Sequence, residues 1–452
     1  MGALKVLLLG LNYAPEPTGI APYTTATARF LAEAGHDVHV VTGLPHYPYW
    51  KVADGYRGPR MHETDGQVRV TRVWHPVPAV PTGRSRITAE LAFAMHAAAA
   101  GGRRPDVVLA VSPALLTVAA ALRWRLPGRT AVGAVVQDLY SRAVAEAGVL
   151  GGRGARSVRQ LERRLLGGCD GVVAIHDTFA DSLAGIGVDR DKVSVIRNWT
   201  HTRPCDGDPR AFRRSMGWGD DETIALHAGN MGAKQGLENV VEAARLADAR
   251  RLPLRFVLLG AGNQRADLER RAVGIERLQF LDPLPTGPFE TALAAADMLV
   301  LNERPEVAEM CVPSKLTSYF AAGRAVVAAT SSRSATTLEV AASGGGVCVA
   351  PGEPGTLLEA ASSVGANPAG AMEMGERGAE YARSVLSADA ARASYVGWVE
   401  NLGLGPRGHA VGERLDTAPS GAVAFRRAFT RAYDANRWQG SQASMIRESG
   451  LG

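Results

Sequence analysis

The chain has 452 residues, of which 46% are hydrophobic and 21% charged, as in an ordinary globular protein. This length predicts two or three domains with sizeable cores. The formal net charge of +5 favours an anionic ligand or an anionic membrane surface and does not require nucleic acid. Four scattered cysteines without a CxxC pair argue against a zinc site or a disulfide framework and predict a reducing, cytosolic compartment.

The first ten residues lack the basic region, long apolar core and cleavage site of a signal peptide. No run reaches the roughly 18 apolar residues that a membrane-spanning helix needs. These features predict a cytoplasmic protein that does not cross the membrane.

Apolar strands alternate with helical stretches through residues 1–200. The first strand, Lys5 to Leu9, is apolar after its lysine, which is typical of a parallel strand buried on both faces. A loop and a helix from about Ala21 follow it. Further strands are expected at residues 37–42, 68–73, 106–111, 131–136, 171–175 and 193–196. This alternation predicts an α/β domain with a parallel sheet covered on both faces.

A polar stretch that contains Gly and Pro, residues 201–221, is expected to be a linker. The pattern then restarts and defines a second domain, residues 222–403, with strands near residues 223–227, 255–259, 278–280, 298–301, 325–329 and 347–349. Two Rossmann-like α/β domains facing each other across a cleft would hold a ligand at the carboxyl ends of their strands. Residues 404–452 are basic and are expected to form a helical or disordered tail, with an amphipathic helix at 424–433.

The stretch LHAGNMGAKQG, residues 226–236, joins a strand to a helix near the middle of the chain. Gly229 allows close backbone approach because it has no Cβ, and Lys234 adds a positive charge. Strand, glycine turn and helix bring backbone N–H groups and a helix N-terminus to an anion. The pattern favours a phosphate site, although an ordinary βα turn has the same local signature.

Segments between about residues 9 and 330 resemble the retaining glycosyltransferases of family four, in particular the bacterial subgroup of exopolysaccharide, colanic acid and O-antigen assembly. They are LGLNYAPEPTGIAPYTTATARFLAEAGHDVHVVTGLPHYP, VVQDLY, GVVAIHDTFADSLAGIGVDRDKVSVIRNW, HAGNMGAKQGLENVVEA, FVLLGAGNQRADL and VPSKLTSYFAAGRAVVAAT. The resemblance implies the GT-B architecture, a UDP- or GDP-sugar donor held mostly by the second domain, and a glycan or lipid-linked acceptor held by the first. It also implies transfer without a bound metal or another cofactor.

The resemblance places the donor diphosphate at the glycine loop, on Gly229, Asn230, Lys234 and Gln235, beside Gly260 of the next strand end. Two positions depart from the family pattern. Asn230 stands where many relatives have arginine, and Lys234 lies one position before their lysine. The resemblance therefore assigns the phosphate charge mainly to Lys234.

The VPSK element supplies a second candidate donor contact, formed by Pro313, Ser314 and Lys315. The alternative for Lys315 is an exposed lysine at the start of a helix. Glu309 is the candidate first member of the family's Glu-x7-Glu pair and would contact the transferred sugar. The second member falls at residue 317 or 318, where this chain has Thr and Ser and therefore no carboxylate.

Asp138 is the candidate catalytic carboxylate of the first domain, because it follows a buried strand and would stabilise an oxocarbenium-like transition state. The alternative for Asp138 is an N-cap of the following segment, a role that is compatible with the catalytic one. Gly19 belongs to the loop that family members place under the donor phosphates and the acceptor. His46 and Tyr47 lie in a loop that is a candidate lining of the acceptor site.

Neither Asp-x-Asp sequence, at residues 189–191 and 206–208, directly follows a strand, so no metal site is expected. A nucleotide-sugar epimerase and a non-catalytic sugar-nucleotide binding protein are the alternative functions. A peripheral position at the inner face of the cell membrane is also predicted. Its candidate surface is the apolar stretch 87–100 with Arg84, Arg86, Arg103 and Arg104, together with Arg123-Trp124-Arg125. A buried core helix is the alternative for residues 87–100.

Overall fold

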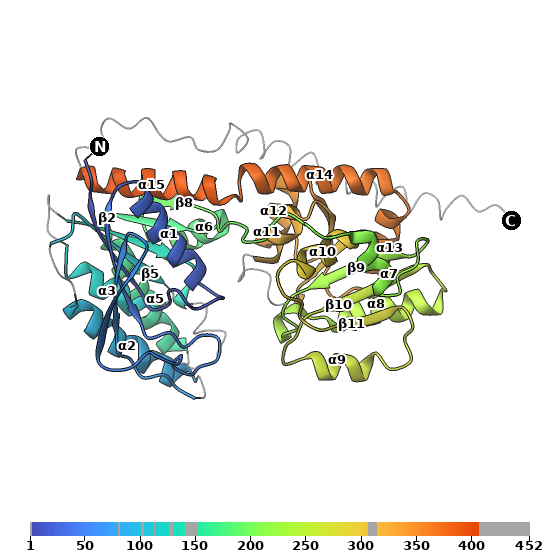
Figure 1. Cartoon of the computed structure of the whole chain (residues 1–452), viewed down its shortest axis with the longest axis horizontal. Helices are drawn as coiled ribbons and strands as arrows, with labels where there is room; N and C mark the ends of the chain where they lie inside the picture. The colour runs from blue at the N-terminus through green and yellow to red at the C-terminus, as the bar shows by residue number, and fades with distance from the viewer. Residues whose placement is uncertain are drawn as a thin grey trace. The chain divides into compact units, whose positions relative to one another are not determined.

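The computed structural model describes residues 2–79, 82–100, 104–112, 114–125, 130–141, 152–305 and 314–405. These residues form two β-sheets, each covered by helices on both faces (Figure 1). The predicted α/β class is therefore confirmed. The basic tail, with its expected helix at 424–433, lies outside the described residues.

The first sheet has the strand order β3-β4-β2-β1-β5-β6-β7-β8. Its strands are β1 Lys5–Gly10, β2 Asp37–Gly43, β3 Arg60–Asp65, β4 Val68–Val73, β5 Val107–Ser112, β6 Ala131–Val136, β7 Gly171–Ala174 and β8 Val193–Val195. All neighbours are parallel except β3, which runs antiparallel to β4. The edge strand β3 was not predicted from the sequence. None of its residues is buried, and it therefore has no apolar run that would mark a strand.

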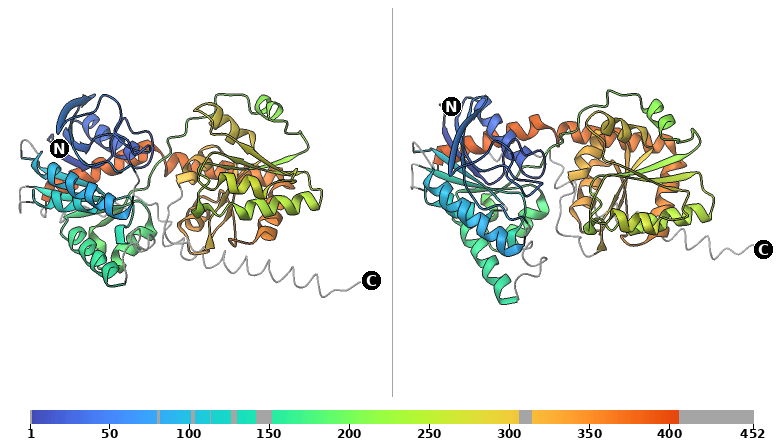
Figure 2. Two further views of the ribbon diagram at one scale, coloured as in Figure 1. Left: turned by 90° about the horizontal axis from the view of Figure 1, so that it is seen from below. Right: turned by 60° about the horizontal axis from the view of Figure 1, so that its bottom comes forward.

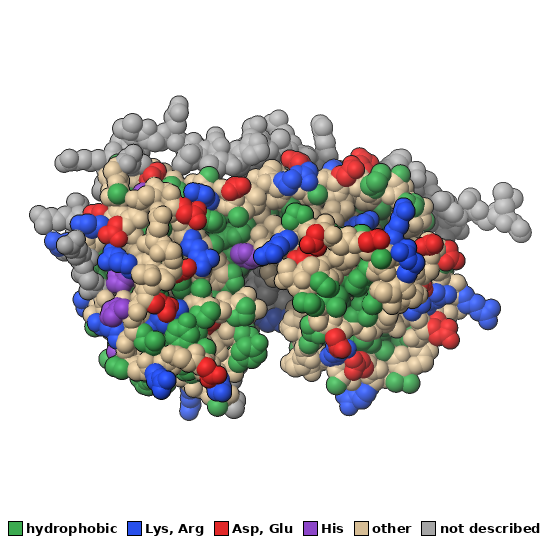
Figure 3. All heavy atoms as spheres, in the orientation of Figure 1, with side chains coloured by type: hydrophobic (Ala, Val, Ile, Leu, Met, Phe, Trp, Pro, Cys, Tyr) green, Lys and Arg blue, Asp and Glu red, His purple; other side chains and the backbone are tan. Residues whose placement is uncertain are grey.

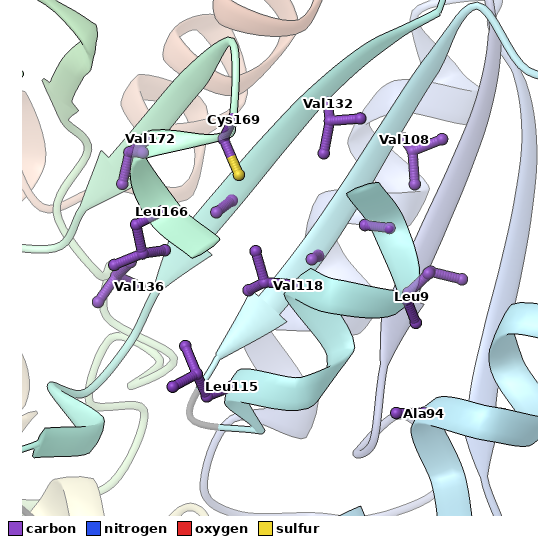
Figure 4. Packing of buried hydrophobic residues seen from close by; sticks show 14 of the residues in the cluster. Leu9, Ala94, Val108, Leu115, Val118, Val132, Val136, Leu166, Cys169 and Val172 are labelled. Carbon is purple, nitrogen blue, oxygen red and sulfur yellow. The ribbon is translucent and has the colours of Figure 1, made fainter. Parts of the chain in front are cut away.

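Two helical layers cover the first sheet. One face carries α2 Gly83–Ala99, α3 Leu115–Leu122, α5 Gly152–Gly167 and α6 Asp177–Gly185. Figure 4 shows Leu115 and Val118 of α3 packed over the strand residues of this face. The other face carries α1 Ala21–Glu33 and α15 Ala388–Leu404, the last described helix.

Two glycines explain how α15 reaches the first sheet. A Cβ atom at Gly133 of β6 would lie 2.6 Å from the Trp398 ring, and one at Gly171 of β7 would lie 3.0 Å from Leu402. Glycine inside a strand often marks such close approach. The predicted second domain, residues 222–403, therefore ends in a helix whose core contacts are with the first sheet.

The second sheet is wholly parallel, with the order β11-β10-β9-β12-β13-β14. Its strands are β9 Thr223–Ala228, β10 Leu254–Leu259, β11 Leu278–Leu281, β12 Met298–Asn302, β13 Ala325–Ala329 and β14 Gly346–Val349. One face carries α8 Glu238–Ala249, α9 Arg265–Arg271 and α13 Pro354–Gly365. The other carries α7 Pro209–Ser215, α10 Pro288–Ala295, α11 Ser314–Ala321, α12 Ala335–Ser343 and α14 Pro368–Ser384. Figure 2 shows these layers from two further directions.

The predicted linker contains the short helix α7. Asp208 caps it by accepting hydrogen bonds from the N–H groups of Arg210 and Ala211, and Phe212 packs against the core of the second sheet. This helix was not predicted, because residues 201–221 are mostly polar and Phe212 is the one aromatic residue of α7 that packs against the core.

Candidate active site

The loops that follow β9 and β10 touch through their backbones. Gly229 and Gly260 both have positive φ angles, of 129° and 139°. A Cβ atom at Gly260 would lie 2.0 Å from the carbonyl oxygen of Gly229. The N–H of Gly229 donates to Leu259, and the N–H of Met231 donates to Ala261, each at 2.8 Å. Glycine at both positions is therefore a steric requirement of this strand edge.

Lys315 lies against the glycine loop. A Cβ atom at Gly229 would lie 2.7 Å from Cε of Lys315, although the two residues are far apart in the chain. Burial and the positive charge of Lys315 lower the pKa of His227, the penultimate residue of β9 before the loop. The fold thus places a lysine ammonium group beside the backbone of the predicted diphosphate loop.

Polar side chains hold the rest of this loop. The amide of Asn302 donates to the carbonyls of Gln235 (2.8 Å) and Gly236 (2.9 Å). The side-chain oxygen of Gln235 accepts from the N–H of Gly232 at 3.1 Å, so it closes the turn. Lys234 is exposed on the short 3₁₀ turn Ala233–Gln235. The structure therefore brings Lys234, Lys315 and Gly229 to one end of the sheet.

Part of the predicted site lies outside the described residues, namely Glu309 and Pro313. Ser314 begins α11. At the two positions considered for the missing second carboxylate, the side chains are hydrogen-bonded within the protein. The Thr317 hydroxyl donates to the carbonyl of Ser314 at 2.7 Å, and the Ser318 hydroxyl accepts from that of Thr202 at 2.8 Å.

Glu303 is a half-buried carboxylate that is not among the residues predicted from the sequence. It follows β12 directly and accepts hydrogen bonds from the hydroxyls of Thr330 and of Thr336, the latter at 2.8 Å. Burial raises the pKa of Glu303, whereas these hydrogen bonds and the charge of Lys315 lower it. A polar residue immediately after a buried strand was the available signal for this position.

In the first half of the chain, Asp138 lies just beyond β6 and is half-buried. One of its carboxylate oxygens accepts from the N–H of Leu139 at 2.8 Å. Next to it, the side-chain amides of Gln137 and Asn198 exchange two hydrogen bonds, of 3.2 and 2.9 Å. Asp138 is thus held at the carboxyl edge of the first sheet, where its sequence position predicted it.

A cavity of about 370 Å³ opens at the carboxyl ends of β1 and β5. Between these strands the order of the sheet changes direction, which is where open parallel sheets bind ligands. Gly19, with a φ of 70°, and Tyr47 line the cavity and pack against each other. The buried carboxylate of Glu16 fixes this wall by accepting from the N–H groups of His46 (2.8 Å) and Tyr47 (2.9 Å).

The two Asp-x-Asp sequences serve as local caps. Asp189 accepts from the N–H of Asp191, and Asp208 caps α7. Within the described ranges, no three His, Cys, Asp or Glu side chains are grouped so that they could hold a metal ion.

The helix α2 has two apolar faces. Phe93 and its neighbours are buried, whereas Ile87, Leu91 and Met95 are 38%, 49% and 65% exposed at a spacing of four residues. Figure 3 shows apolar side chains at the surface over the lower part of the first half, where Figure 1 places α2. None of the described helices is long and apolar enough to cross a bilayer.

Two Rossmann-like halves, each with a sheet covered by helices on both faces, form the GT-B architecture, a fold shared with solved glycosyltransferases. Residues 18–199 match the glycosyl transferase 4-like domain, and residues 222–367 match glycosyl transferases group 1. The chain is 32% identical over 336 residues to the putative colanic acid biosynthesis glycosyl transferase WcaI of Escherichia coli K12, covering 71% of this chain and 82% of that protein. It belongs to this glycosyltransferase family, as the sequence resemblance indicated.

Solved structures of low sequence identity share the fold. Sucrose-phosphate synthase from Thermosynechococcus elongatus has a TM-score of 0.68 at 17% identity, over 88% of this chain and 98% of that chain. HepE from Anabaena, in complex with UDP, has a TM-score of 0.63 at 14% identity, over 88% and 100%. The family matches and the E. coli relative support a sugar transferase, and they give no support to the epimerase alternative.

Proposed function

We propose that the protein transfers a sugar, with retention of configuration, from a UDP- or GDP-sugar to a glycan or lipid-linked acceptor. The observation that carries this proposal is the position of Lys315 beside Gly229, at the carboxyl end of β9. A lysine ammonium group beside a glycine backbone suits the diphosphate of such a donor.

The leaving group of the reaction is the nucleoside diphosphate, on which negative charge develops as the glycosidic bond breaks. Lys315 and Lys234 stabilise that charge electrostatically, and the effect is larger in the transition state than in the ground state. The acceptor hydroxyl then attacks from the face that the diphosphate leaves. HepE was solved with UDP-glucose as well as with UDP, which makes uridine the first base to test.

The chain has five lysines among its fifty basic residues, so single lysine variants test this proposal cleanly. We expect Lys315→Ala and Lys234→Ala each to weaken binding of UDP or GDP about ten- to a hundred-fold, because a charge-assisted contact is lost. Titration calorimetry measures the change. Lys5→Ala is the matched control, because Lys5 is exposed at the amino end of β1. Wild-type affinity in both site variants would place the diphosphate elsewhere.

We propose further that α2 docks the protein on an anionic membrane surface, where lipid-linked acceptors reside. The exposed residues Ile87, Leu91 and Met95 form an apolar stripe, and Arg84 and Arg86 are exposed at the start of the same helix. An amphipathic surface of this kind suits the interface between headgroups and acyl chains. Arg103 and the tail arginines 426, 427 and 431 lie outside the described residues.

A further inference from the structure

Glu90 is a carboxyl group in the wall of the cavity at β1 and β5. It lies on α2, one turn after Arg86, whose guanidinium stacks over the Trp50 ring at 5.0 Å. Its oxygen Oε2 is buried and has no hydrogen-bond partner among the described residues. A buried polar atom without a partner costs free energy, so this arrangement needs a reason.

The cavity around Glu90 has the composition of a site for a small polar ligand with an apolar face. Trp50, Tyr47 and Ile20 supply apolar surface, whereas Asn12 and Ser112 supply polar groups. Ligand sites typically combine a mostly apolar lining with a few polar groups that fix orientation. A pyranose ring has this dual character, with C–H faces that pack on aromatic rings and hydroxyls at its edge.

We propose that Glu90 determines acceptor specificity by hydrogen-bonding a hydroxyl group of the acceptor sugar in this cavity. The inference rests on the proposed sugar transfer and adds the group that recognises the second substrate. Rotation about the last torsion of the glutamate side chain turns either oxygen to the cavity. A bound hydroxyl would supply the hydrogen bond that Oε2 does not receive from the described residues.

The protonation state of Glu90 fits this role. Burial raises the pKa of Glu90 to about 8, and the charge of Arg86 opposes the shift only in part. Burial raises the pKa of Tyr140, beyond β6, and the carboxylate forms of Glu90 and Glu162 would raise it further. His46 and Tyr47 are further titratable groups of the cavity wall. At neutral pH the carboxyl group is therefore mostly protonated and can both donate and accept a hydrogen bond.

The test uses octyl glycosides of glucose, galactose and mannose, below their micelle concentrations, as acceptor probes. Saturation-transfer NMR should detect binding of at least one of them to the full chain. Glu90→Leu should weaken that binding about ten-fold or more, because the polar contact is lost. Glu90→Gln, which keeps the shape and both hydrogen-bonding roles, should retain most of it. Glu373→Leu, an exposed position on α14, is the control.

Two further measurements separate binding from folding. Glu90→Leu should melt at or above the wild-type temperature, because it removes a buried carboxyl oxygen that has no hydrogen-bond partner among the described residues. UDP and GDP affinities should be the same in both Glu90 variants as in the wild type. A wild type that binds neither nucleotide would contradict the proposed function alone. The inference is overturned if no glycoside binds the wild type, or if Glu90→Leu binds the probes as the wild type does.

Discussion

Gly229 and Lys315 depend on each other, because the lysine side chain occupies the space that any Cβ atom at residue 229 would fill. An alanine at 229 would also be strained at a φ of 129°. The effect of a substitution at either residue is therefore coupled to the other, and the two changes should not be additive. The glycine shapes the loop and also gives the lysine access to it.

Asp138 is the candidate catalytic carboxylate whose charge can be removed without loss of shape. Its hydrogen bond from the N–H of Leu139 survives replacement by asparagine, which also accepts. We expect Asp138→Asn to lower turnover about ten-fold or more and to leave nucleotide affinity nearly unchanged, since charge stabilisation acts in the transition state. Steady-state kinetics and calorimetry give the two quantities, and an unchanged turnover number would leave Asp138 a purely structural role.

Among the helices, α15 shows how an element of the second half stabilises the first. Trp398 is 9% exposed and fits against strand glycines of β6 and β7. We expect Trp398→Ala to destabilise the protein by about 3–5 kcal/mol, because it leaves a large cavity. Urea unfolding followed by circular dichroism measures the loss. Met372→Ala, at a position 64% exposed on α14, should change stability by no more than about 0.5 kcal/mol.

The exposed apolar face of α2 leads us to expect that the protein binds membranes. The protein should co-sediment with vesicles that contain anionic lipid, and salt should weaken this binding by screening. Changing Arg84, Arg86, Arg103 and Arg104 together should reduce it, at about 1 kcal/mol for each base near the surface.

Replacement of both Leu91 and Met95 by serine should also reduce vesicle binding, whereas Met372→Ser should not. Equal recovery with neutral and anionic vesicles would remove the electrostatic part of the docking proposal. No recovery with either kind of vesicle would contradict the proposal that α2 docks on a membrane.

At the scale of the whole molecule, a buried ion cluster joins the end of the first Rossmann-like half to the second. Glu339 of α12 accepts from Arg197 at 2.8 Å and from Tyr381 at 2.8 Å, and it lies 3.1 Å from His176. Burial alone would raise the pKa of Glu339, but the His176 hydrogen bond and the Arg197 charge lower it to about 2. Removing Arg197 would leave the buried carboxylate of Glu339 without its guanidinium partner, which is strongly destabilising.

The whole catalytic cycle should run without a divalent metal. The diphosphate charge is assigned to Lys234, Lys315 and backbone N–H groups, and the aspartates 189 and 208 act as caps. Sugar transfer should therefore keep its rate in excess EDTA. A loss of activity on chelation that magnesium or manganese restores would contradict this assignment.

The sequence by itself determined most of the secondary structure and the fold class. Buried parallel strands are continuous apolar runs, so their pattern is local and visible, as Lys5–Gly10 and Met298–Asn302 show. The glycine loop was visible for the same reason, because its signature lies within eleven residues. Among the described elements, the edge strand β3 and the helix α7 were not predicted, since neither has an apolar run of its own.

The tertiary structure alone decided which distant residues meet. It placed Lys315 beside Gly229 and two threonine hydroxyls against Glu303, and it put Oε2 of Glu90 in a cavity wall with no partner among the described residues. It also returned α15 to the first sheet. Each of these facts depends on packing between segments far apart in the chain. Local periodicity carries no information about such contacts, because it records which face of an element is buried and not what covers that face.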